Sequence, residues 1–266
     1  MSEEESASVA VLAGAVVRTA IAPMLCEPLV SSGQVTQQLA GHSVEILEDH
    51  SDWLRVRGVD DYAGWMHHGY LARLAETPAH ENPGPVRVSL GCVTRDSSGT
   101  RRALPLRAML APDEVVLSGD VIDAEQLPER FPTDAAAITR SAQELFVGTS
   151  YQWGGVTPWG ADCSGLAQSV FALHGVQLPR DAWQQAHAGE DGGRDMLAAR
   201  VADLLFFSDR VDGHITHVAI GLGGRRLVHL ALGRGGFAVE RLDDTRDPYV
   251  RKLRDRFLFI RRVLTG

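Results

Sequence analysis

The sequence has few cysteines, and they do not lie close together. Cys26, Cys92 and Cys163 are the only three in 266 residues. An odd number at such wide spacing excludes the disulfide framework of a small secreted domain and fits a reducing compartment. Cys26 and Cys92 lie in strand-like segments, and we interpret both as structural.

An excess of basic residues and a long apolar run are also missing. The formal net charge is −8 and no basic patch stands out, which argues against nucleic acid as a partner. Segment 9–22 is mildly apolar, but Arg18 interrupts it and it is too short to span a membrane. Residues 1–6 are acidic where a secretory signal needs a basic region. We expect a cytoplasmic monomer without a membrane partner.

The motifs of nucleotide cofactors are absent as well. We find no phosphate-binding loop and no dinucleotide-type glycine motif. Segment 232–236 is rich in glycine, but it is more simply a turn that joins two strands. We therefore expect no cofactor.

One stretch, residues 151–171, joins a turn-rich segment to a helix. The turn-forming residues are Gly154, Gly155, Pro158 and Gly160. Apolar residues then recur at helical spacing at Leu166, Val170 and Leu173. Cys163 stands where the helix begins, and Asp162 is a candidate N-cap. Because a helix N-terminus favours a thiolate, we expect Cys163 to have a depressed pKa and to act as a nucleophile.

Composition divides the rest of the chain into a short tail, two β-rich modules and a larger domain. We place a disordered tail at 1–8, the first module at 9–78, the second at 84–130 and the large domain at 133–266. Residues 77–85 have the composition of a linker. Short predicted strands about ten residues apart suggest that the first module is a small barrel. Those strands are 16–21, 44–47, 53–57 and 64–66.

The second module has strand-like segments at 86–90, 91–94 and 114–117, with a hairpin turn at 96–99. In the large domain, segment 133–147 is a predicted helix capped by Thr133 or Asp134. A short helix is expected at 181–187. Five strands then follow, at 204–207, 217–222, 226–230, 236–240 and 257–263. Helices followed by a run of antiparallel strands indicate an α+β fold.

Two histidines are suitably placed to serve the cysteine. A nucleophilic thiolate needs a base, and the base needs a partner that holds its ring. His217 opens an apolar strand, and His229 lies near the end of the next one, so antiparallel pairing can bring them together. We assign His217 as general base and then acid, and His229 as its orienting partner. An alternative in which His214, His217 and His229 bind zinc fits poorly, because no metalloprotease spacing or nearby Glu accompanies them.

The first module resembles a bacterial SH3 domain over residues 44–71, where a Gly-Trp pair precedes the last strand. Residues 133–263 resemble the NlpC/P60 family of cysteine peptidases. The motifs that carry this resemblance are Tyr151-Gln-Trp-Gly-Gly155, Asp162-Cys-Ser-Gly165, Asp203-Leu-Leu-Phe-Phe207, His217-Val-Ala-Ile220 and His229. The resemblance implies a papain-like catalytic domain preceded by two small SH3-like β-barrel domains, with no metal.

The same resemblance implies a function. A family branch with two SH3-like domains contains γ-D-glutamyl-L-diamino acid endopeptidases, which act on free murein peptides, L-Ala-γ-D-Glu-diamino acid. Four residues match motif positions that bind the L-Ala end, namely Tyr151, Asp162, Ser164 and Asp181. Asp181 would pair with the free amine. Tyr62 and Trp153 are further candidate contacts.

Two positions depart from the pattern of that branch. Ala182 replaces a frequent serine after Asp181, and His42 stands where the first module often has a glutamate. Two alternative functions also remain. The chain could be a hydrolase of intact peptidoglycan, or an SH3-based wall-binding protein with vestigial catalysis. Whether the diamino acid is diaminopimelate or lysine is left open.

Overall fold

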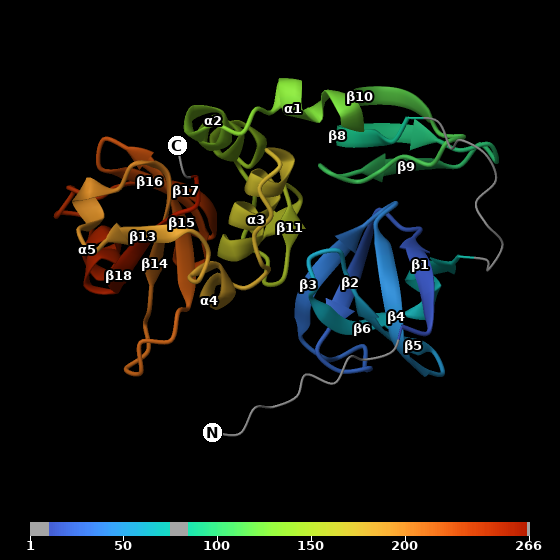
Figure 1. Ribbon diagram of the computed structural model, residues 1–266, viewed down its shortest axis with the longest axis horizontal. Coiled ribbons are helices and arrows are strands. Elements are labelled where there is room, and N and C mark those ends of the chain that lie inside the picture. The colour runs from blue at the N-terminus through green and yellow to red at the C-terminus, as the bar shows by residue number, and fades with distance from the viewer. Residues whose placement is uncertain (1–10, 75–84, 265–266) are drawn as a thin grey trace.

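The computed structural model describes residues 11–74 and 85–264, and its β-rich N-terminal part packs beside an α+β C-terminal part (Figure 1). The predicted tail at 1–8 and nearly all of the predicted linker at 77–85 lie outside the described residues. None of the described helices is both long and apolar enough to cross a membrane.

The N-terminal part is a seven-stranded antiparallel sheet in the order β3-β2-β6-β5-β4-β1-β7. Its strands are β1 Ala13–Val17, β2 Ile21–Leu25, β3 Gln34–Leu39, β4 Ser43–His50, β5 Trp53–Arg57, β6 Ala63–His67 and β7 Leu71–Arg73, with a 3-10 turn, η1, at His68–Tyr70. Alternate residues such as Leu54 and Val56 point into one core, as a period of two requires. The predicted strands at 44–47, 53–57 and 64–66 are confirmed.

The predicted strand at 16–21 is wrong, because the chain turns within it. β1 ends at Val17 and β2 starts at Ile21, and the two strands pair with different neighbours. The apolar pattern hides this turn, since no glycine or proline marks residues 18–20. Strand β3 was not expected at all, because its glutamines and threonine show no apolar alternation.

The next region forms a three-stranded antiparallel sheet in the order β10-β8-β9, with β8 at Arg87–Arg95, β9 at Arg101–Leu104 and β10 at Val115–Asp123. The hairpin turn predicted at 96–99 is confirmed, and the Asp96 carboxylate accepts from the Thr100 N–H at 2.9 Å. The two segments expected at 86–94 are one strand, which continues through Gly91 with φ at 107°. That this region is a second SH3-like unit stays a prediction.

The C-terminal part follows the expected α+β order. The helical elements that precede its sheet are η2 Ala124–Gln126, α1 Leu127–Arg130, α2 Ala135–Leu145, α3 Cys163–Leu173 and α4 Ala182–Gln185, and the two short strands β11 Val156–Thr157 and β12 Gly160–Ala161 pair between α2 and α3. The six-stranded sheet runs β13-β18-β14-β15-β16-β17. Its strands are β13 Glu190–Gly193, β14 Val201–Phe207, β15 His217–Gly223, β16 Arg226–Ala231, β17 Gly236–Arg241 and β18 Phe257–Arg262, interspersed with η3 Met196–Ala198, η4 Leu232–Arg234 and α5 Pro248–Asp255.

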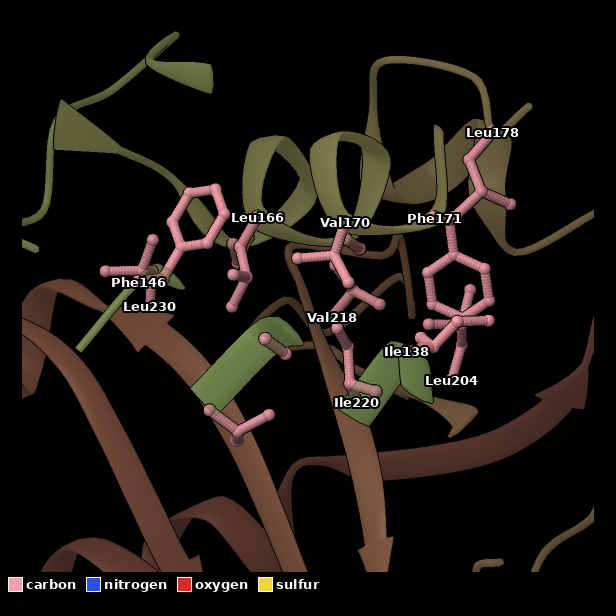
Figure 2. Close-up of a cluster of buried hydrophobic side chains, with 14 of the residues drawn as sticks. Ile138, Phe146, Leu166, Val170, Phe171, Leu178, Leu204, Val218, Ile220 and Leu230 are labelled. Atoms are coloured by element: carbon pink, nitrogen blue, oxygen red, sulfur yellow. The ribbon is translucent and has the colours of Figure 1, made fainter. Parts of the chain in front are cut away.

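Helix α3 is central to the C-terminal core, because almost all of its side chains are buried. Figure 2 shows Leu166, Val170 and Phe171 of α3 above Val218 and Ile220 of β15. Burying an apolar side chain of this size contributes about 1.5–3 kcal/mol. The packing therefore holds the first turn of α3, with Cys163, against the start of β15.

Candidate active site

Cys163 is the first residue of α3, as predicted. Asp162 caps the helix, and its Oδ1 accepts from the Gly165 N–H at 2.7 Å. A Cβ atom at Gly165 would lie 2.0 Å from the Gly155 carbonyl oxygen, so only glycine allows the loop to approach the helix here. Cys163 is buried but lines the main cavity.

The expectation of a depressed Cys163 pKa is wrong for the free protein. Burial raises the pKa of the Cys163 thiol to about 12, and the nearby negative charge of Asp162 adds to the rise. Hydrogen bonds from the Val218 and Ser164 N–H groups and the charge of Arg180 oppose it without reversing it. Desolvation outweighs the helix terminus, so the thiol is protonated at neutral pH.

His217 and His229 lie together, as the strand pattern predicted. His217 Nε2 is 2.9 Å from His229 Nδ1, and the rings meet edge to face. Burial, followed by the neighbouring His229 and Arg256, lowers the pKa of His217 well below its ordinary value. The lowered pKa favours the neutral form of His217, which can accept a proton. It faces the same cavity as Cys163, whereas His229 is fully buried behind it.

Glu240 of β17 lies next to His229 on the side away from His217, and it was not predicted from the sequence. Its Oε1 lies 3.4 Å from His229 Nε2, and Arg234 holds the same carboxylate at 2.7 and 2.9 Å. Burial acts to raise the pKa of Glu240, but bonds from His229 and Arg234 lower it overall. A carboxylate here favours a proton on His229 Nε2, and in that tautomer His229 Nδ1 accepts from His217 Nε2–H. The lone pair of His217 Nδ1 is then available as the base. An acidic residue directly after the apolar run 237–239 of β17 was the available signal.

Asp162 and Ser164 are held by a buried arginine that the sequence analysis did not single out. The Arg180 side chain is 1% exposed, and its guanidinium bonds both Asp162 oxygens, at 2.7 and 3.1 Å, and Ser164 Oγ at 2.9 Å. Its Nε also donates to Thr36 Oγ1 of β3 at 2.8 Å. The Asp162 carboxylate additionally accepts from the Gly154 N–H. These protein donors occupy oxygens that were expected to bind the L-Ala end of the substrate.

Replacing Arg180 with methionine is expected to destabilise the protein strongly. The variant leaves the Asp162 carboxylate buried without its counter-ion, which costs about 3–5 kcal/mol. Urea unfolding followed by tryptophan fluorescence measures the loss. Arg194, an exposed arginine of the same domain, provides a matched control, and its change to methionine should stay within about 0.5 kcal/mol. A loss below about 1 kcal/mol in Arg180→Met would contradict this account of the ion pair.

Among the described residues, the Asp181 carboxylate, unlike that of Asp162, is paired with no arginine, and it faces the cavity. The Tyr62 hydroxyl, from the turn between β5 and β6, donates to Asp181 Oδ2 at 3.0 Å, and Trp183 Nε1 approaches the same oxygen at 3.3 Å. Burial, then the charge of Asp181, raises the pKa of Tyr62 to about 12. Asp181 is also the N-cap residue of α4, and its N–H donates to Gln184 Oε1. The helix-cap role and the wall role therefore coexist.

The predicted contacts surround one cavity of about 710 Å³ between the N-terminal sheet and the C-terminal domain. The candidates that line it are Tyr62, Tyr151, Trp153, Asp162, Cys163, Ser164, Asp181 and His217. Trp153 is 68% exposed at the rim, and the carbonyl oxygen of Trp153 accepts from Gln34 of β3. Burial, then the charges of Cys163 and Asp162, raises the pKa of the Tyr151 hydroxyl.

The two departures from the family pattern have different surroundings. Ala182 lines the cavity with a methyl group only. His42 instead lines a separate, smaller pocket, where its Nε2 lies 3.1 Å from the Arg107 carbonyl oxygen. Burial lowers the pKa of His42 to about 4. His42 therefore joins the two β-rich regions rather than facing the cavity.

The zinc alternative gains no support from the geometry. Within residues 11–74 and 85–264, the side chains that lie close enough to share an ion are Asp52, His67 and His68. His214, His217 and His229 form no such group.

Comparisons with known proteins match both parts of the chain. Residues 148–253 match the model of the NlpC/P60 family, and residues 27–72 match that of the bacterial SH3 domain. The chain is similar to the gamma-D-glutamyl-L-lysine dipeptidyl-peptidase of Bacillus subtilis (strain 168), with 28% identity covering 82% of this chain and 78% of that protein. Dipeptidyl-peptidase 6 of Lysinibacillus sphaericus is 26% identical, covering 88% of this chain and 94% of that protein.

A solved structure shows the same fold. The crystal structure of an NlpC/P60 family protein from Bacillus cereus ATCC 10987 superposes with a TM-score of 0.78 and 19% identity, covering 95% of this chain and all of that one. The chain therefore carries a domain of the NlpC/P60 cysteine peptidase family, preceded by a bacterial SH3 domain.

Proposed function

We propose that the chain hydrolyses the bond between γ-D-glutamate and a diamino acid in murein peptides that carry a free N-terminal L-Ala. The observation that carries the proposal is the Tyr62–Asp181 bond at 3.0 Å, which places a carboxylate where the N-terminal sheet meets the cavity. A carboxylate in such a partly dry site favours an ammonium group. The name of the similar Bacillus subtilis protein, a gamma-D-glutamyl-L-lysine dipeptidyl-peptidase, supports the same bond specificity.

In the proposed mechanism, the Cys163 thiol passes its proton to His217 as Sγ attacks the γ-glutamyl carbonyl carbon. His229 and Glu240 hold the His217 ring and stabilise the imidazolium that forms. The oxyanion meets N–H groups at the start of α3, that of Cys163 among them. His217 then gives its proton to the leaving amine, and water hydrolyses the thioester that remains.

The requirement for a free amine separates this proposal from hydrolysis of the intact wall. In an intact stem peptide the L-Ala nitrogen is an amide, which carries no charge for Asp181 to bind. Only released peptides offer the ammonium group, so the proposed role is the recycling of murein peptides. A cytoplasmic location stays a prediction. Cleavage of a synthetic tripeptide with a free amine, measured by chromatography of the products, tests the function directly.

The pH dependence of thiol alkylation tests how the nucleophile is activated. With its pKa raised, the Cys163 thiolate fraction increases about tenfold for each pH unit through neutrality. The rate of iodoacetamide modification at Cys163 is therefore expected to climb steadily from pH 6 to pH 9. Mass spectrometry of the Cys163 peptide measures it, and the exposed Cys26 gives an internal comparison. A rapid, flat rate below pH 7 would instead indicate a preformed thiolate–imidazolium pair.

A further inference from the structure

Helix α5 and the residue that follows it bring two cations, Lys252 and Arg256, to the cavity. One face of α5, continued by the residue after it, lines the cavity. Its residues follow helical spacing and are Tyr249, Lys252, Leu253 and Arg256. Figure 1 shows α4 between α5 and the N-terminal sheet that supplies Tyr62. The cavity therefore has the Asp181 carboxylate where Tyr62 of the N-terminal sheet meets it, and Lys252 and Arg256 beside α5, where Asp209 also lines it.

Arg256 lines the same cavity as His217 and Cys163. Its positive charge is close enough to His217 to lower the pKa of that ring, and its backbone oxygen accepts from the Ser208 N–H at 2.9 Å. In the mechanism above, His217 protonates the leaving amine. A group beside His217 and away from Asp181 therefore faces the amino acid that is released.

The carboxylates of the protein neutralise the positive charges of Lys252 and Arg256 only weakly. Among the described residues, no carboxylate oxygen lies within 4.0 Å of the Lys252 ammonium group, and the Asp209 carboxylate approaches Arg256 only to 3.7 Å. By contrast, Arg210, another cation at the cavity, is held by Asp212 at 2.7 Å. Lys252 and Arg256 thus have donors to offer a ligand.

We propose that Lys252 and Arg256 form a subsite for a carboxylate on the amino acid released by cleavage. The proposal rests on the proposed function, which supplies the direction of the peptide in the cavity. Two carboxylates have this chemistry. One is the α-carboxylate of a diamino acid at the end of a tripeptide, and the other is the additional side-chain carboxylate of diaminopimelate. A lysine side chain ends in an ammonium group without that carboxylate, so nothing on it offsets the repulsion by the same cations.

Four peptide substrates distinguish the two candidate carboxylates. L-Ala-γ-D-Glu is extended with either L-lysine or meso-diaminopimelate, each with its α-carboxylate free or amidated. The values of kcat/KM are compared for the wild type, Lys252→Gln and Arg256→Gln. Arg246→Gln removes the same charge from a residue that does not line the cavity and whose side chain is 95% exposed. Because each variant is judged by its ratio between two substrates, a general change in catalysis cancels.

We expect the wild type to cleave the substrate that carries the bound carboxylate with a kcat/KM about tenfold higher than the matched substrate without it. This factor is the value of one charge-assisted hydrogen bond. Lys252→Gln and Arg256→Gln should each reduce that ratio toward one, while Arg246→Gln should keep it. A preference for the free over the amidated α-carboxylate, equal for both diamino acids, identifies the α-carboxylate. A preference for diaminopimelate over lysine that survives amidation identifies the side chain. Equal kcat/KM for all four peptides would overturn the subsite and leave the peptidase function intact. Cleavage of none of them would overturn both proposals.

Discussion

Replacing Cys163 with alanine is expected to abolish cleavage of L-Ala-γ-D-Glu-diamino acid peptides, with a fall in kcat of at least about 10⁴-fold. No other described side chain in the cavity carries a thiol at a helix start beside a histidine base. His217→Ala should cause a loss of similar size, because the protonated thiol needs a base during the attack. Rates of product formation under substrate excess give both values.

Controls separate lost chemistry from lost structure. Cys26→Ala removes an exposed thiol away from the cavity and should retain full activity. The thermal unfolding midpoint of Cys163→Ala should stay close to that of the wild type, because only one sulfur atom is lost. If either Cys163→Ala or His217→Ala retained a rate within tenfold of the wild type, the proposed nucleophile and base would be wrong.

Acetylating the substrate amine is expected to reduce kcat/KM by about 10²–10³-fold, because a partly buried carboxylate loses its charged partner. Asp181 is the carboxylate concerned. Asp181→Asn should reduce cleavage of the free-amine peptide to a similar extent. The same variant should cleave free and acetylated peptides at comparable rates, since the charge pair is already broken. The four rate constants form a double-mutant cycle that isolates the interaction.

Tyr62→Phe is the matched control for the far side of this pocket. It keeps the ring that lines the cavity and removes only the hydroxyl that donates to Asp181. A moderate loss of about tenfold is expected, since one hydrogen bond to a charged group is removed. A wild-type enzyme that cleaved the acetylated peptide as rapidly as the free one would reject the role of Asp181. That outcome would favour the alternative of a hydrolase acting on the intact wall.

The sequence by itself determined the elements that carry the chemistry. The position of Cys163 at a helix start, the helix at 133–147 and the strands with His217 and His229 all follow from periods of 3.6 and two residues. These patterns are local, so they can be detected along the chain. Where the local signal was weak, as in the turn at residues 18–20 and in strand β3, the prediction failed.

Only the tertiary structure decided which distant residues contact one another in the site. Tyr62 and Asp181 are 119 residues apart in the chain, and no periodic pattern links them. The Arg180–Asp162 pair and the Glu240–His229 contact likewise depend on burial and on packing between distant segments. Burial also reversed the expected direction of the Cys163 pKa, because desolvation is a property of the folded surroundings and not of the helix start alone.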